Sequence, residues 1–112
     1  MTQDINVQVS SGNVFADLGL PNPEEMLIKA ELARQISEII IQQHLTQIEA
    51  AELLGIDQPK VFALMRGKLT GFSIERLFRL LNALGRDVEI VVKPKPRSQK
   101  EAKTSVSLSS TF

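Results

Sequence analysis

The feature that most constrains the fold of this chain is a segment that predicts two short helices joined by a tight glycine turn, at residues 45–68. Thr46 and Glu49 have the spacing of a capping box, in which each side chain accepts a hydrogen bond from the backbone N–H group of the other residue. Gly55 can adopt the left-handed conformation that ends a helix, and Asp57 can cap the helix that follows. The segment therefore predicts a helix, a turn and a second helix.

Two further helices are predicted, one on each side of this segment. The stretch Asn22-Pro23-Glu24-Glu25 combines a cap, a proline suited to the first turn and two acids that complement the helix dipole. That helix should run over residues 23 to about 43, and Ser73 should cap a fourth helix at residues 74–84. Apolar residues at helical spacing should face a common core: Met26, Ala30, Ala33, Ile36 and Ile40, then Ile48, Ala51 and Leu54, then Val61 and Leu64 with Met65 beside them, then Leu77, Leu80, Leu81 and Leu84.

The two ends of this helical region have different patterns. Residues 14–20 should form one more helical turn, which Pro21 prevents from continuing. Residues 87–93 change to an alternating, β-branched pattern and predict a strand without a hairpin partner. A lone strand needs a neighbour, either residues 5–9 or the same strand of a second subunit. We favour the second, because a twofold dimer needs a contact between its subunits.

The composition fits one small domain with flexible ends. The chain has 112 residues, of which 43% are apolar, enough for one modest core. We expect residues 1–13 to be flexible, residues 14–93 to form the folded domain and residues 94–112 to form a disordered basic, Ser-rich tail. The chain has no cysteine, no apolar run near the roughly 20 residues of a membrane span and no secretory signal. We therefore expect a cytoplasmic protein with no membrane partner.

The net charge of zero hides an uneven distribution. Residues 1–52 hold eight acids and two bases, a charge of −6, whereas residues 53–112 hold five acids and eleven bases, a charge of +6. Such a split suggests a nucleic-acid face in the basic half, although a solvated surface with a basic tail would also produce it. The chain has no Trp or Tyr and only five Phe for base stacking. This composition argues against a single-strand binder.

The predicted helix at residues 58–66 carries cations and no acids, as does a helix that enters the major groove of DNA. Gln58 can form a bidentate pair with adenine, and Lys60 can reach a guanine or a phosphate. Phe62 can pack on a thymine methyl group. Three further residues are placed to contact DNA phosphates: Gln47, at the start of the preceding helix, and Arg66 and Lys68, which flank Gly67.

Several motifs within residues 13–93 together resemble the lambda repressor/Cro-like (XRE) helix-turn-helix family. They are Leu45-Thr-Gln-x-x-Ala-Ala-x-x-Leu-Gly-Ile-x-Gln-Pro-Lys-Val, then Arg66-Gly-Lys, Phe72-Ser-Ile-x-x-Leu and Ala83-Leu-Gly-x-x-Val-x-Ile. The leader Asn13-Val-Phe-Ala-Asp-Leu-Gly-Leu also resembles that of an antitoxin subfamily found beside RelE-like toxins. The resemblance implies an all-α, lambda-repressor-like domain of four to five helices with one C-terminal β-strand.

The resemblance also implies a double-stranded DNA partner, a homodimer, and the same division between base and phosphate contacts. Many relatives carry Ser where this chain has Phe62, and a longer polar residue where it has Ala63. Because both positions are apolar here, the details of base readout should differ from those relatives.

Two functions follow from this interpretation. The first is a sequence-specific transcriptional regulator that acts as a repressor, including an antitoxin that represses its own operon. The alternative is a protein-interaction module whose main act is to neutralise a RelE-like toxin. A plain four-helix bundle with a basic surface fits the caps and the glycine turn less well. We expect no enzyme activity, catalytic residue, metal or cofactor, because no such constellation appears and the single histidine, His44, suits a surface or capping role.

Overall fold

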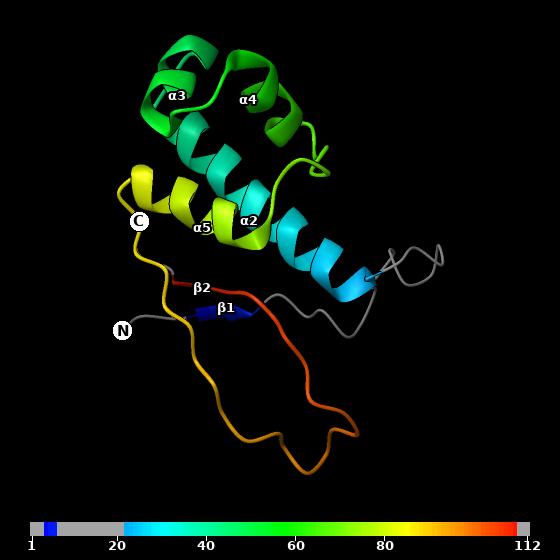
Figure 1. Ribbon diagram of the computed structural model, residues 1–112. Helices are drawn as coiled ribbons and strands as arrows, with labels where there is room; N and C mark the ends of the chain where they lie inside the picture. Colours follow the sequence, from blue (N-terminus) through cyan, green and yellow to red (C-terminus); the bar gives the residue numbers. More distant parts are fainter. Residues whose placement is uncertain (1–3, 7–21, 110–112) are drawn as a thin grey trace. The chain divides into compact units, whose positions relative to one another are not determined.

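The computed structural model describes residues 4–6 and 22–109, which contain four helices and two short strands (Figure 1). The helices are α2 (Pro23–Gln42), α3 (Gln47–Leu54), α4 (Gln58–Met65) and α5 (Ile74–Ala83). The strands β1 (Asp4–Asn6) and β2 (Ser107–Ser109) pair antiparallel. The chain divides into a helical unit, residues 29–89, and a second unit of residues 1–28 and 90–112, so that the first part of α2 belongs to the second unit.

The helix starts follow the predicted caps. The Thr46 hydroxyl accepts a hydrogen bond from the Glu49 N–H at 3.1 Å, and the Glu49 carboxylate accepts one from the Thr46 N–H at 2.9 Å, which confirms the capping box. Asp57 and Ser73 cap α4 and α5 in the same way, each accepting from the backbone N–H three residues later, at 2.9 and 3.0 Å. These bonds satisfy N–H groups that have no partner within a helix.

The helix ends depend on residues in the left-handed conformation. Gly55 and Gly67 have φ angles of 70° and 76° after α3 and α4, where a residue without a Cβ avoids strain. His44 has the same conformation after α2, with a φ of 55°. The Leu45 N–H then donates to the Ile40 carbonyl at 3.1 Å and closes that helix end. The exposed His44 is therefore a helix-terminating surface residue, as predicted.

The start of α2 differs from the predicted Asn cap. Asn22 has a φ of 52°, whereas an N-cap residue normally has an extended backbone. Its carbonyl still accepts the first helical hydrogen bond, from the Met26 N–H at 3.0 Å. Met26 itself is half-buried, so the apolar stripe predicted for this helix enters the core only further along the chain.

The core of the helical unit consists of apolar residues from all four helices. Most of the predicted inward residues are buried, and Ile36, Val61 and Leu77 are completely so. The buried apolar residues of this unit are Leu32, Ala33, Ile36, Ile39, Ile40, Ala50, Ala51, Leu54, Val61, Leu64, Phe72, Leu77, Leu80, Leu81 and Leu84. Met65 and Ala30, at the edges of the predicted stripes, are half-buried.

The predicted inward position of Ile48 is wrong. Its side chain is 55% exposed, while Ala50 is completely buried in its place. The buried face of α3 is formed by Ala50, Ala51 and Leu54. With about 100° of rotation per residue, Ile48 lies about 110° from the centre of that face. Ile48 and Ala51 do have the spacing of neighbours on one side of a helix. The buried face extends from Ala51 toward Ala50 and Leu54, and Ile48 lies on the opposite side of Ala51.

The predicted strand at residues 87–93 is also wrong for the single chain. These residues follow α5 without any ladder hydrogen bonds, and β1, which includes part of the proposed N-terminal partner, pairs instead with β2. A strand is stable only beside a partner, and the described part of one chain offers none to this segment. The C-terminal strand expected from the resemblance is therefore absent there, and the strand that does form is the short β2.

The segment predicted to be a disordered tail has several hydrogen bonds, and its disorder stays a prediction. Besides β2, the Lys95 ammonium donates to the Gln99 carbonyl at 2.6 Å, and the Thr104 N–H donates to the Glu24 carboxylate at 2.5 Å. Backbone groups can form such bonds without an apolar core, which is why the composition did not reveal them. The helical turn predicted at residues 14–20 lies outside the described residues, so a count of five helices has no support.

Candidate nucleic-acid interface

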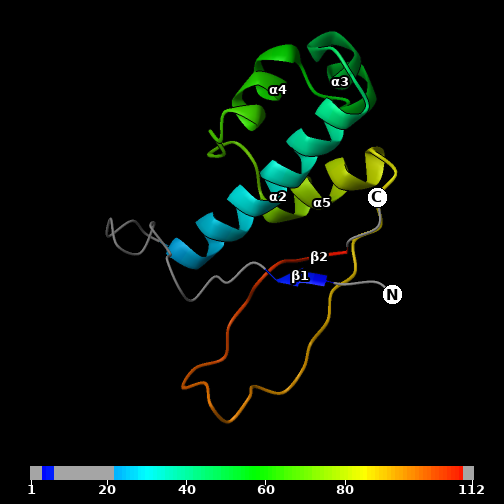
Figure 2. The same cartoon turned by 180° about the vertical axis from the view of Figure 1, so that it is seen from behind.

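The candidate site is the exposed face of α4, which α3 and the Gly55 turn hold in place. In the helical unit α3 contacts both α4 and α5, and α3 and α4 lie side by side (Figures 1 and 2). Val61 and Leu64 anchor α4 in the core, because each is almost completely buried. The opposite side of the helix is exposed and accessible to a ligand.

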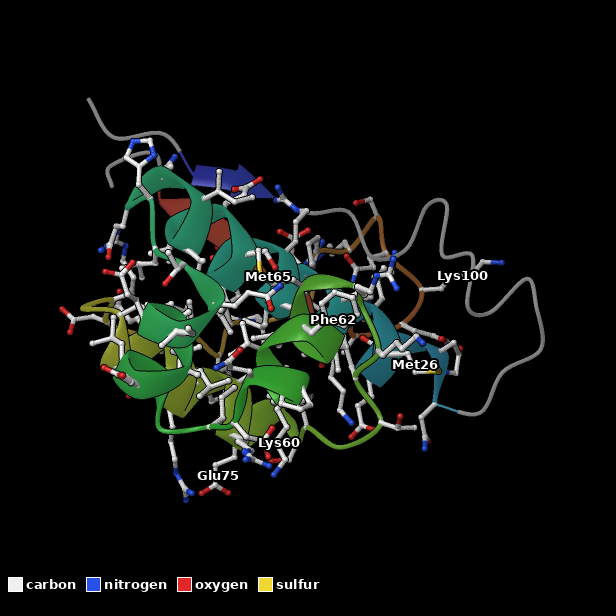
Figure 3. The ribbon with its side chains drawn as sticks, turned by 90° about the horizontal axis from the view of Figure 1, so that it is seen from above. Met26, Lys60, Phe62, Met65, Glu75 and Lys100 are labelled. Atoms are coloured by element: carbon white, nitrogen blue, oxygen red, sulfur yellow. The ribbon has the colours of Figure 1, made fainter. Side chains whose placement is uncertain are left out.

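The exposed surface of α4 has a centre and two edges. At about 100° per residue, Phe62 and Arg66 lie opposite the buried residues, on the central stripe of that face. Gln58 and Lys60 lie at its two edges, about 90° and about 70° from the centre of the buried side. All four side chains are exposed. Figure 3 shows Lys60 and Phe62 extending from α4. The three predicted base readers therefore occur on one accessible surface, with Phe62 between the two polar residues.

Phe62 and Arg66 form a contact that the sequence analysis did not identify. The Arg66 guanidinium carbon lies 4.6 Å from the centroid of the Phe62 ring, within the range of a cation–π interaction. The two residues are four positions apart, so they are neighbours on the helix surface. This spacing was the signal available in the sequence. The ring supports one face of the guanidinium and leaves donors at its edge open to a phosphate.

The predicted phosphate-contacting residues are accessible, and within the described part of the chain none of them belongs to an ion pair. Gln47 is exposed at the first position of α3, beside backbone N–H groups of the helix start. Arg66 and Lys68 are exposed as well. Among the described residues, the ion pairs join Arg34 to Glu31 and Glu38, and Arg79 to Glu75. Lys60, Arg66 and Lys68 are in none of them, so their charges are available to an anionic partner.

Arg34 illustrates a cation that is already neutralised. Its Nε donates to the two carboxylate oxygens of the buried Glu31 at 3.1 and 3.0 Å, and a further nitrogen bonds Glu38. The hydrogen bond with Glu31 is the main reason that the pKa of Arg34 is raised above its usual value. With two carboxylates beside it, Arg34 offers little net charge to DNA. Its role is to pair Glu31, which would otherwise be a buried charge without a partner.

Two features are absent from the described part of the chain. None of its helices is long and apolar enough to cross a bilayer. No group of three or more His, Asp or Glu side chains in that part of the chain could hold a metal ion.

A short exposed helix that follows another helix and a tight glycine turn is the arrangement of the helix-turn-helix class of DNA-binding domain. A family of helix-turn-helix domains matches residues 14–93, and the chain belongs to this family. It is similar to a solved structure whose name places it among XRE family transcriptional regulators, with 52% identity and a TM-score of 0.74. That match covers 77% of this chain and 97% of the other.

A comparison with curated proteins finds no match. The family and the solved structure confirm the predicted resemblance to XRE-like helix-turn-helix regulators. They place the chain among the DNA-binding transcriptional regulators.

Proposed function

We propose that the protein is a dimeric repressor that binds a specific duplex operator with α4 in the major groove. Gln58 would pair with an adenine, Lys60 with a guanine or phosphate, and Phe62 would pack on a thymine methyl group. The observation that carries the proposal is the exposed, acid-free face of α4 between two helix ends fixed by hydrogen bonds. Helix termini fixed in this way hold the reading residues in one orientation.

The phosphate contacts of the proposal surround this face. Gln47 approaches the DNA phosphates from the start of α3, while Arg66 and Lys68 approach them from the end of α4. Contacts of this kind position a protein on DNA without reading its sequence. Specificity then depends on the two edges and the centre of α4, where this chain has an unusually apolar pair, Phe62 and Ala63.

Binding to a selected duplex should weaken steeply with salt. The experiment selects duplexes from a random library with the full chain, and then measures affinity for the enriched duplex by fluorescence anisotropy at several salt concentrations. A plot of log affinity against log salt should fall with a slope of about −0.9 for each phosphate neutralised. Equal affinity for the enriched duplex and for a shuffled duplex of the same composition would remove the proposal.

A second candidate is a protein-interaction module that acts mainly as an antitoxin and neutralises a RelE-like toxin. The supporting observation is the charge of −6 on residues 1–52, which suits a basic, RNA-cleaving partner. The test is to co-express the chain with the product of the neighbouring gene and to look for a stable complex by co-purification. Absence of a complex would leave the DNA-binding role standing alone.

A further inference from the structure

Residues 90–92 expose three consecutive β-branched side chains. Ile90 and Val91 are each 72% exposed and Val92 is 93% exposed, in a segment outside the helices and strands that has no ladder hydrogen bonds. Such residues favour strands, because their branched side chains pack well on a pleated surface. Backbone groups without ladder bonds beside such side chains are a template for pairing with another chain, as they are at the edge of a sheet. The exposed segment therefore has both the backbone and the side chains for a partner strand.

We propose that residues 87–93 pair antiparallel with the same residues of a second copy of this chain, with the twofold axis at Ile90. The inference rests on the dimeric repressor proposed above and names its dimer contact. A twofold interface uses the same surface on both subunits, so its partner segment must be complementary to itself. The sequence Asp87-Val-Glu-Ile-Val-Val-Lys93 meets this requirement.

The self-pairing places apolar residues together on one face, and on the other it places Asp87 opposite Lys93 at both ends with Glu89 opposite Val91 between them. With Ile90 opposite Ile90 of the second copy, Val88 lies opposite Val92, so alternate residues form a continuous apolar face. On the other face Asp87 lies opposite Lys93, and this pair occurs twice. Cross-strand pairs of both kinds stabilise a sheet.

The prolines that follow fit the same register. Pro94 and Pro96 lie an even number of residues from Ile90. In an antiparallel ladder, hydrogen-bonded and non-hydrogen-bonded pairs alternate. If Ile90 forms a non-hydrogen-bonded pair, both prolines occupy non-hydrogen-bonded positions, where a missing N–H costs no ladder bond. Side chains in such pairs are also closer together, which favours the contact between the two Ile90 side chains.

Neighbouring registers are less complementary. A shift of one position toward the N-terminus places Arg86 opposite Lys93, and a shift of one position the other way places Val88 opposite Lys93. A twofold axis at Glu89 places the two Glu89 carboxylates together. An axis at Val91 pairs Glu89 with Lys93 but leaves Val88 opposite Pro94. Only the axis at Ile90 pairs all three residues of the apolar face with one another.

Single cysteines test the register directly, because the chain has no cysteine of its own. We would prepare the full-length variants Ile90→Cys, Val91→Cys and Val92→Cys, oxidise each with diamide and follow the covalent dimer on non-reducing gels. Two residues at position 90 would be close enough for a disulfide, whereas residues at position 92 would be displaced by about 14 Å along the strands. Ile90→Cys should cross-link at least about tenfold faster than Val92→Cys.

Val91→Cys is the matched control, because the two wild-type side chains are equally exposed. Faster cross-linking at position 91 than at position 90 would overturn the register, and equal rates at all three positions would overturn the pairing. Duplex binding by the wild-type chain is measured separately. A chain that binds the selected duplex but does not cross-link at position 90 would contradict the dimer contact alone. Failure of the contact and failure of the DNA-binding proposal are thus distinguishable.

Charge reversal provides a second measurement that needs no disulfide. The variants Asp87→Lys and Lys93→Asp each place like charges opposite one another, and each should weaken self-association by about tenfold. An equimolar mixture restores both opposite-charge pairs, so it should form heterodimers with near wild-type affinity in sedimentation velocity. Failure of the mixture to associate better than either variant alone would contradict the pairing of Asp87 with Lys93.

Discussion

Replacement of Ile36 by alanine should lower the free energy of unfolding by about 2–5 kcal/mol. Ile36 is in the middle of α2 and is completely buried in the core of the helical unit. The truncation removes buried apolar surface and leaves a cavity, and a small domain has only about 5–15 kcal/mol of total stability. Urea unfolding followed by circular dichroism at 222 nm measures the change.

Ile41→Ala is the control for this prediction. Ile41 belongs to the same helix but is 63% exposed, so its truncation should change the free energy of unfolding by less than about 0.5 kcal/mol. The slight advantage of alanine as a helix former acts in the same way at both positions. Equal losses for the two variants would mean that the helical unit is not packed around Ile36.

Neutralisation of Lys60, Arg66 and Lys68 together should greatly weaken duplex binding and reduce its dependence on salt. The variant Lys60→Gln/Arg66→Gln/Lys68→Gln keeps long polar side chains on an exposed surface, so the fold should persist. Each lost phosphate contact should reduce the slope of log affinity against log salt by about 0.9. Loss of the Arg66 and Lys68 contacts therefore removes about 1.8 for each subunit bound, and a phosphate contact of Lys60 would bring this to about 2.7. The measurement is a salt titration by fluorescence anisotropy on the selected duplex.

Three tail cations provide a control with the same change in charge. Lys95, Lys100 and Lys103 are exposed and lie outside the helical unit. Their replacement by glutamine changes the net charge as much as the α4 variant does. The long-range attraction between protein and DNA therefore falls equally in both variants, while the tail variant keeps the contacts around α4. If the tail variant loses as much of the slope as the α4 variant, the phosphate contacts are not concentrated around α4.

The local features of the fold could be predicted because the signals are short. Thr46, Gly55, Asp57 and Ser73 act through hydrogen bonds or backbone angles within a few residues, so their types and spacing were sufficient. The inward leucines of α5 were predictable for a similar reason, since a strongly amphipathic helix shows which face it buries. The candidate site was accessible to prediction because it lies on such a locally defined helix.

Features that depend on packing could not be predicted in this way. The direction of the buried face of α3 is decided by its neighbours, which is why Ile48 was misplaced and Ala50 was not recognised as core. The pair of Glu31 with Arg34 was missed because the burial of Glu31 is a property of the assembled core. Residues 87–93 have the alternating, β-branched pattern of a strand, but such a pattern does not show whether the same chain supplies a partner strand.

The central claim, that α4 reads base pairs through its exposed face, is tested most directly by a specificity profile of Gln58→Ala. The affinities of wild type and variant are measured for the selected duplex and for every single base-pair substitution of it. The account predicts that discrimination falls by about 1–3 kcal/mol at one A·T pair in each half-site and is retained elsewhere. An unchanged profile at every position, with or without a uniform loss of affinity, would contradict it.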